Sequence, residues 1–102
     1  MFKLVISRLA QKDLEDIVEY ISVQLANPTA ASNFLDETEK CYEHLKLNPL
    51  IYAKSTDRRL EKEGYRKALI KKYLLMFKVN EETKTVTAYR FIHGSMDYIK
   101  LL

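Results

Sequence analysis

Apolar residues near the N-terminus recur at the spacings of an amphipathic helix. The run at 2–6 reads as a short strand, and Ser7 can cap the helix that follows it. From Leu9 to about Ala26 the apolar residues are three and four positions apart, which places them on one stripe of a helix. The residues of that stripe are Leu14, Ile17, Val18, Ile21 and Leu25. The pattern therefore predicts a strand followed by a long helix.

A second helical pattern begins at Asn27-Pro28, where asparagine suits the cap position and proline the first helical position. It runs from about Pro28 to Leu47, and the following Asn48-Pro49 ends it. Cys41 falls on its apolar stripe and is expected in the core, whereas His44 is expected on the surface. Because the joint between the two helices is short, they should form an antiparallel hairpin.

Beyond Pro49 the periodicity changes. Residues 50–63 are dense in charge and show no clean period, so that a helix and a loop both remain open there. Three strand-like runs follow, at 65–70, 73–79 and 85–92. Lys71-Lys72 would turn the chain between the first two runs and residues 80–84 between the last two, and 96–102 would form a short tail.

This order of elements predicts one domain over residues 1–102, of the α+β class. The expected architecture is strand–helix–helix–three-stranded meander, with the helical hairpin packed on one face of a small, mostly antiparallel sheet. Nothing in the sequence is an obvious cover for the other face. A functional surface could lie on that open face.

The composition excludes several classes of protein. One cysteine in 102 residues allows no internal disulfide and no cysteine zinc cluster, and two glycines allow no glycine-rich phosphate loop. No apolar run approaches the roughly 18 residues of a membrane span, and the N-terminal segment is too short and too early charged for a secretory signal. We therefore expect a cytoplasmic protein without a membrane partner.

Charge is distributed unevenly along the chain. Residues 1–51 carry 5 Lys/Arg and 8 Asp/Glu, whereas residues 52–102 carry 12 Lys/Arg and 6 Asp/Glu. The segment 52–78 alone holds nine basic and three acidic residues. Such a segment attracts a polyanion or an acidic partner, although a lysine-rich face that keeps the protein soluble has the same pattern.

The side chains that could carry out chemistry are mainly cationic, and none of them forms a metal-binding motif. The two histidines lie far apart and no ligand spacing surrounds either, so no metal and no cofactor is expected. Cations, a proton acceptor and a proton donor suffice for metal-free RNA cleavage. The catalytic candidates of that kind are Arg66, Arg90, His93 and Tyr98. The candidate binding residues are Arg58, Arg59, Lys67, Lys71 and Lys72.

Each catalytic candidate also has a structural interpretation. Arg90 shares a strand with apolar residues, so it could instead be a partly buried arginine paired to a carboxylate such as Glu61 or Asp97. His93, at the end of a strand, could be a hydrogen-bonded turn residue. Taken one at a time, these structural interpretations are favoured over catalysis.

Four stretches, at 10–21, 30–34, 63–70 and 89–98, resemble the ParE/RelE superfamily of type II toxin–antitoxin toxins. The last stretch, Tyr89-Arg-Phe-Ile-His-Gly-Ser-Met-Asp-Tyr98, is the most specific of them. The resemblance implies a growth-arresting toxin neutralised by a cognate antitoxin, whose acidic C-terminal part folds onto the toxin. It is compatible with a homodimer and with a toxin–antitoxin heterotetramer.

The resemblance implies two different targets. ParE-like members are described as acting on DNA gyrase, and the C-terminal stretch has the ParE form. RelE-like members cut mRNA on the ribosome, and in this chain Arg66 and Arg90 match their strand arginines, with His93 and Tyr98 at the late positions. The central strand begins at Tyr73 without the arginine of some ribonuclease members. We expect a ParE-like toxin that acts on DNA gyrase, and the alternative is a RelE-like, metal-free endoribonuclease that cuts mRNA on the ribosome.

Overall fold

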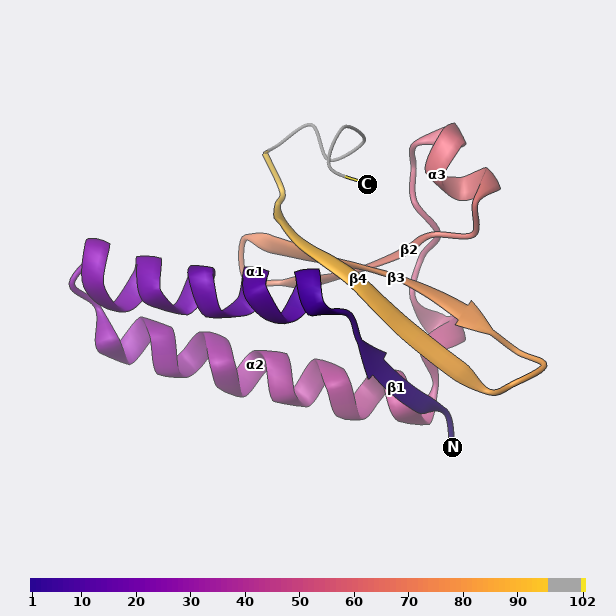
Figure 1. Cartoon of the computed structure of the whole chain (residues 1–102), viewed down its shortest axis with the longest axis horizontal. Coiled ribbons are helices and arrows are strands. Elements are labelled where there is room, and N and C mark those ends of the chain that lie inside the picture. The colour runs from indigo at the N-terminus through magenta and orange to yellow at the C-terminus, as the bar shows by residue number, and fades with distance from the viewer. Residues whose placement is uncertain (96–101) are drawn as a thin grey trace.

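The computed structural model of the chain describes residues 1–95 and 102, and its elements follow the predicted order (Figure 1). The strands are β1 (Lys3–Ile6), β2 (Arg66–Ile70), β3 (Tyr73–Asn80) and β4 (Thr85–His93). The helices are α1 (Arg8–Glu19), α2 (Pro28–Leu47) and α3 (Arg58–Lys62), with a π-helical turn at Tyr20–Gln24 and a 3-10 turn at Pro49–Ile51. Apart from Leu102, the predicted C-terminal tail lies outside the described residues.

The four strands form one sheet in the order β1-β4-β3-β2. β2 pairs antiparallel with β3 and β3 pairs antiparallel with β4, while β1 lies parallel to β4. A parallel pair needs a long connection, and the helical hairpin with the meander provides it. The prediction of an α+β fold with a mostly antiparallel sheet is confirmed.

The helical hairpin covers one face of the sheet, as predicted (Figure 1). Its buried side chains meet those of β2, β3 and β4 in the main core, where Phe34, Leu45 and Phe77 are almost completely buried. Cys41 is buried there too, and His44 is exposed, both as expected. Apart from Leu25, which is exposed, the apolar stripes read from the sequence therefore face the sheet and hold the hairpin on it.

The end of α1 differs from the prediction. Instead of continuing as an α-helix to Ala26, the chain widens into the π-helical turn, where the Leu25 amide donates to the Tyr20 carbonyl at 3.0 Å. Ala26 then takes a left-handed φ of 48° before α2 begins. A bond between residues five apart brings Tyr20 and Leu25 to the same side of the chain, whereas an α-helix aligns residues three and four apart.

Residues 50–63, which the sequence left open, form the second half of the 3-10 turn, a loop and the short helix α3. Asp57 caps α3 by accepting hydrogen bonds from the amides of Arg59 and Leu60. Leu60, 4% exposed, packs in a small second core on the sheet face opposite the long helices. The other buried members of that core are Tyr65, Met76 and Ile92. The face expected to be open is thus partly covered by α3.

Candidate functional site

Arg66, a catalytic candidate on β2, is held by backbone groups. It shares the helix-covered face of the sheet with Ala68, because alternate residues of a strand point the same way. Its Nη1 donates to the carbonyl oxygen of Tyr52 at 2.7 Å and lies 3.5 Å from that of Leu50. Arg66 therefore fastens the 3-10 turn and the residue after it to the sheet.

Arg90 is paired with a carboxylate on α1. Its Nε donates to Oδ2 of Asp13 at 2.7 Å and its Nη2 to Oδ1 at 3.0 Å, which is the bidentate geometry of a strong ion pair. The hydrogen bond to Asp13 raises the pKa of Arg90. Pairing with a carboxylate was one of the two interpretations of Arg90, but the partner is Asp13 rather than Glu61, and Asp97 lies outside the described residues.

The same region of β4 contains a β-bulge. Met76 of β3 pairs with Arg90 while the next residue, Phe77, pairs with Ala88, so Tyr89 is left without an opposite partner. α1 supplies the hydrogen bonds that β4 needs there. Asp13 Oδ2 accepts from the Phe91 amide at 3.0 Å. The hydroxyl of Ser7, the N-cap of α1, donates to the Tyr89 carbonyl at 2.9 Å.

His93 lies at the end of β4 and is hydrogen bonded within its own turn. Its Nδ1 accepts from the Ser95 amide at 3.2 Å and lies 2.7 Å from the Ser95 hydroxyl. Its ring packs edge-to-face on Tyr73, with the centroids 5.3 Å apart. Tyr98, the remaining catalytic candidate, lies outside the described residues.

The three described catalytic candidates are not gathered at one point. Arg66 pairs across the sheet with Phe77 and His93 pairs with Tyr73, four positions away along β3. At about 3.3 Å per residue the two rungs lie roughly 13 Å apart. Arg90 lies at the bulge of β4, and its guanidinium is taken up by Asp13 of α1. Acid–base catalysis needs groups within about 3 Å of the reacting atoms, or one water molecule away.

The binding candidates divide between α3 and the sheet. Arg58 and Arg59 are exposed on α3, and Lys67 is half-buried on the face of β2 that α3 borders. Lys71 and Lys72 form the tight turn between β2 and β3, and both are exposed. The five residues therefore belong to two separate surfaces rather than to one.

The β2–β3 turn borders a cavity of about 430 Å³, which we call the turn cavity. Its lining combines apolar and aromatic side chains of the helical hairpin and β3 with the two lysines and a histidine. The lining residues are Tyr20, Ile21, Leu25, Ala30, Asn33, Phe34, Lys71, Lys72, Tyr73 and His93. Volume and lining are typical of a site that receives a small molecule or an anchoring side chain.

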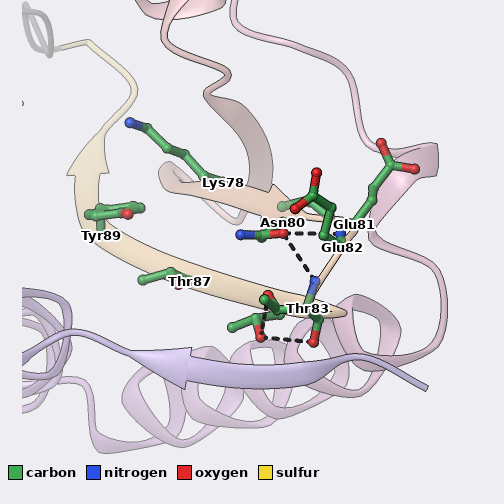
Figure 2. A pocket seen from close by; sticks show the side chains of 9 residues that line it. Lys78, Asn80, Glu81, Glu82, Thr83, Thr87 and Tyr89 are labelled. Atoms are coloured by element: carbon green, nitrogen blue, oxygen red, sulfur yellow. Dashed lines mark hydrogen bonds between the residues drawn. The ribbon is translucent and has the colours of Figure 1, made fainter.

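A second cavity of about 770 Å³, which we call the hairpin cavity, lies at the other end of β3 (Figure 2). Figure 2 shows Lys78 and Tyr89 on the two strands, with Glu81 and Glu82 on the loop that joins them. The Asn80 side chain accepts hydrogen bonds from two amides of this loop, at 3.0 and 3.1 Å. This cavity is polar and its loop is internally hydrogen bonded.

Between the hairpin cavity and α3, a lysine is placed over two aromatic rings. Lys78 Nζ lies 4.5 Å from the ring centroid of Tyr65 and 5.5 Å from that of Tyr89. The two rings meet edge-to-face with their centroids 5.6 Å apart. Burial raises the pKa of the Tyr65 hydroxyl.

The family to which the chain belongs follows from its sequence as a whole. The model of the ParE toxin of type II toxin–antitoxin systems, parDE, matches residues 4–98. The chain belongs to the ParE toxin family. No curated protein sequence matches it significantly.

Two solved structures are similar to this ParE-family chain in fold. The first is the chromosomal ParDE toxin–antitoxin system from P. aeruginosa, with a TM-score of 0.70 and 21% identity, over 91% of this chain and 96% of that one. The second is the toxin–antitoxin complex RelBE2 from Mycobacterium tuberculosis, with a TM-score of 0.64 and 22% identity, over 90% of this chain and 96% of that one.

Two residues that sequence reasoning did not place at the site are Asp13 and Tyr20 of this ParE-family chain. Asp13 lies three residues after Ala10 and four before Ile17, both of which are buried, so a carboxylate at that position needed a partner. That spacing was the available signal. Tyr20 carried no such signal, because only the π-helical turn brings it beside Leu25.

Two further observations concern ligands and membranes. Within residues 1–95 and 102, no group of three or more His, Cys, Asp and Glu side chains is arranged to hold a metal ion. Burial raises the pKa of the Cys41 thiol, which makes the reactive thiolate scarcer. Among the described helices, none has the length and apolar character needed to cross a bilayer.

Proposed function

We propose that this ParE-family toxin arrests growth by binding DNA gyrase in the cytoplasm, without chemistry of its own. The observation that supports binding over catalysis is the state of the three described candidates. Arg66 holds backbone carbonyls, Arg90 is paired with Asp13, and His93 lies at the far end of β3 from Arg66. The ParE form of the C-terminal stretch favours gyrase as the target.

We further infer that a cognate antitoxin neutralises the toxin. Both similar structures are titled as toxin–antitoxin systems. The basic segment 52–78 attracts an acidic polypeptide, and a disordered acidic segment that folds on binding can wrap such a surface. The complex could be a heterotetramer, and the toxin alone could be a homodimer. The molar mass in solution distinguishes these assemblies.

A ribosome-dependent, metal-free endoribonuclease is the second candidate function. It is favoured by the cluster of Lys78, Tyr65 and Tyr89, because cations beside aromatic rings suit single-stranded RNA. In that case Arg66, Arg90, His93 and Tyr98 would have to be brought together by the bound RNA.

The experiment that separates the two functions is induced expression in a bacterial host lacking the antitoxin. Transcript 5′ ends and plasmid supercoiling are measured on the same cells, with and without co-expressed antitoxin. Relaxed plasmid or gyrase-linked breaks with intact messages are the expected result. New 5′ ends inside translated messages, with supercoiling unchanged, would contradict the gyrase proposal and support the endoribonuclease.

Purified components provide the direct test. The toxin should inhibit supercoiling by purified gyrase in a reaction that contains no ribosomes, and prior addition of antitoxin should abolish the inhibition. A toxin that leaves gyrase unaffected over a wide range of concentration, yet stops growth in cells, would exclude gyrase as its target.

A further inference from the structure

The turn cavity combines an apolar lining with unpaired positive charge. The rings of Phe34, Tyr73 and His93 form a continuous edge-to-face series, with centroid separations of 5.4 and 5.3 Å. Phe34 is 1% exposed, so this part of the lining is rigid and belongs to the main core. Burial also raises the pKa of Tyr73, which stays neutral.

The rim of the turn cavity exposes further apolar surface. Tyr20 is 49% exposed and Leu25 55%, both on or beside the π-helical turn. Because this turn places Tyr20 and Leu25 on one side, both line the cavity. Contiguous exposed apolar residues around a cavity are typical of an interaction site.

The charge of the turn cavity has no partner among residues 1–95 and 102. Lys71 and Lys72 lie on its edge, and neither ammonium group makes an ion pair or hydrogen bond within the described residues. Among the described residues that line the cavity, none is acidic. An occupant that carries carboxylates would therefore meet two unpaired cations and no repulsion from the wall.

The backbone at Lys71 indicates that the lysine is retained at an energetic cost. Its φ is 56°, in the left-handed region that favours glycine or asparagine at such a turn. A residue with a Cβ in this region costs about 1–2 kcal/mol.

We propose that the turn cavity is the docking site for an acidic, amphipathic segment of the antitoxin. An apolar side chain of that segment enters the cavity against Phe34 and Tyr73, and neighbouring carboxylates pair with Lys71 and Lys72. This inference rests on the proposed function, since it takes the antitoxin as the partner and adds where and how it is held.

Other occupants fit the cavity less well. A nucleic-acid backbone would satisfy the lysines, but it has no aliphatic side chain for the exposed rim around Leu25. A second copy of this chain could offer Glu81 and Glu82, but the loop that carries them is polar and held by hydrogen bonds to Asn80. A segment that carries an apolar side chain and carboxylates close together in its sequence matches both the apolar lining and the two lysines of the cavity.

The test measures the affinity of the purified toxin for the antitoxin encoded beside it, by calorimetry at two salt concentrations. The charge variant is Lys71→Glu/Lys72→Glu, and its control is Lys84→Glu, a lysine with the same left-handed φ at the opposite end of β3. The expected increase in Kd is about tenfold or more for the charge variant and less than about twofold for the control. The penalty should shrink at high salt.

A second variant fills the cavity without changing charge. Ala30→Leu adds a side chain at a position that lines the cavity, and Thr29→Leu adds the same side chain one residue earlier, outside the lining. The Kd should rise about tenfold for the first and hardly at all for the second. Thermal unfolding of each variant alone shows whether the toxin itself is still folded.

The outcomes separate this proposal from the function on which it rests. Antitoxin binding that stays within about twofold of wild type in both cavity variants would overturn the docking site while leaving the toxin–antitoxin function intact. A wild-type chain that neither slows growth nor binds the adjacent-gene product would instead contradict the proposed function. Toxin copies that associate through the cavity, seen as a molar mass that falls in the charge variant without antitoxin, would favour a second copy as the occupant and overturn the proposal.

Discussion

The two turns at opposite ends of β3 carry the same unusual backbone and opposite chemistry. Lys71 in the β2–β3 turn has a φ of 56°, and Lys84 in the β3–β4 loop has a φ of 55°. Lys84 places its ammonium 4.9 Å from the centre of the Phe2 ring, which is a favourable cation–π contact. Lys71 has no such contact within the described residues.

The adjoining cavities differ in the same way. The hairpin cavity is the larger, at about 770 Å³ against about 430 Å³, but its lining is polar and two acidic side chains, Glu81 and Glu82, lie on its loop (Figure 2). The turn cavity is smaller, and its lining combines exposed apolar side chains with two lysines that pair with no other described residue. Size alone therefore does not identify a binding site, and the docking proposal rests on the apolar lining and the two lysines at the turn end.

The largest expected effect comes from removing the carboxylate that holds β4 between these two ends. Asp13→Ala leaves Arg90 without its bidentate partner and the Phe91 amide without an acceptor. The two side chains of the pair are 14% and 22% exposed, so the loss should cost about 3 kcal/mol of the free energy of unfolding. Urea titration monitored by circular dichroism measures it.

The matched control is Asp16→Ala. Asp16 pairs with Lys12 at 2.7 Å, but both side chains are more than half exposed, so the loss should stay below about 0.5 kcal/mol. Amide hydrogen exchange shows which part of β4 is destabilised. In Asp13→Ala the amides of β4 near Phe91 should lose protection before those near Thr85, and a uniform loss along β4 would argue against a local clamp.

A smaller loss is expected for Arg66→Ala. The guanidinium donates to the Tyr52 carbonyl at 2.7 Å and holds the turn that precedes α3, and charged hydrogen bonds contribute about 1.5–3 kcal/mol. We expect a loss of about 2 kcal/mol in urea titration, and less than about 0.5 kcal/mol for Arg59→Ala, whose side chain is 74% exposed. If Arg66→Ala abolished toxicity with stability unchanged, Arg66 would be a functional residue rather than a structural one.

The fold was readable from the sequence because its periodicities are strong and local. Apolar residues three and four apart placed both long helices, and the caps at Ser7 and Asn27 accept hydrogen bonds from Ala10 and Ala30, as those residue types favour. The strands follow from runs of β-branched and aromatic residues between turns. These are short-range signals, which the chain carries within each element.

The site was only partly readable because its decisive contacts join distant residues. The sequence identified Arg90 as a residue that needed a carboxylate, but Asp13 is 77 positions away and no local pattern connects the two. The turn cavity depends on the π-helical turn, where a change in hydrogen bonding from four to five residues brings Tyr20 beside Leu25. Residue types alone do not encode such a register change.

Glycine substitutions at Lys71 and Lys84, the two lysines with a left-handed φ, test whether the turns at the two ends of β3 contribute differently to the free energy of unfolding. Lys71→Gly relieves the strained φ and loses no contact, so thermal unfolding should show a gain of about 0.5–1 kcal/mol after the entropy of glycine in the unfolded chain is subtracted. Lys84→Gly relieves the same strain but loses the contact with Phe2, so its net change should be close to zero. Equal gains at both ends would mean that the cation–π contact contributes nothing.

The smallest effect is expected at Tyr42, in the part of α2 near the β3–β4 end. Its hydroxyl is buried without a partner among the described residues, and burial raises the pKa of Tyr42 to about 12. Tyr42→Phe removes the unsatisfied group and should stabilise the protein at pH 7 by about 0.5 kcal/mol. Tyr52→Phe is the control, because burial also raises the pKa of Tyr52 to about 12 but its hydroxyl is not among the buried groups without a partner.

Tyr42→Phe should also change how the free energy of unfolding depends on pH in alkaline solution. A tyrosine whose pKa is higher in the folded than in the unfolded chain keeps its full contribution to stability below about pH 10 and loses it as the pH rises through 12, because the unfolded state releases its proton first. The wild-type free energy of unfolding should therefore fall between pH 10 and 12, and the fall should be shallower in Tyr42→Phe. Parallel curves for the two proteins would show that Tyr42 titrates in the folded state as it does in water, and that its hydroxyl reaches solvent.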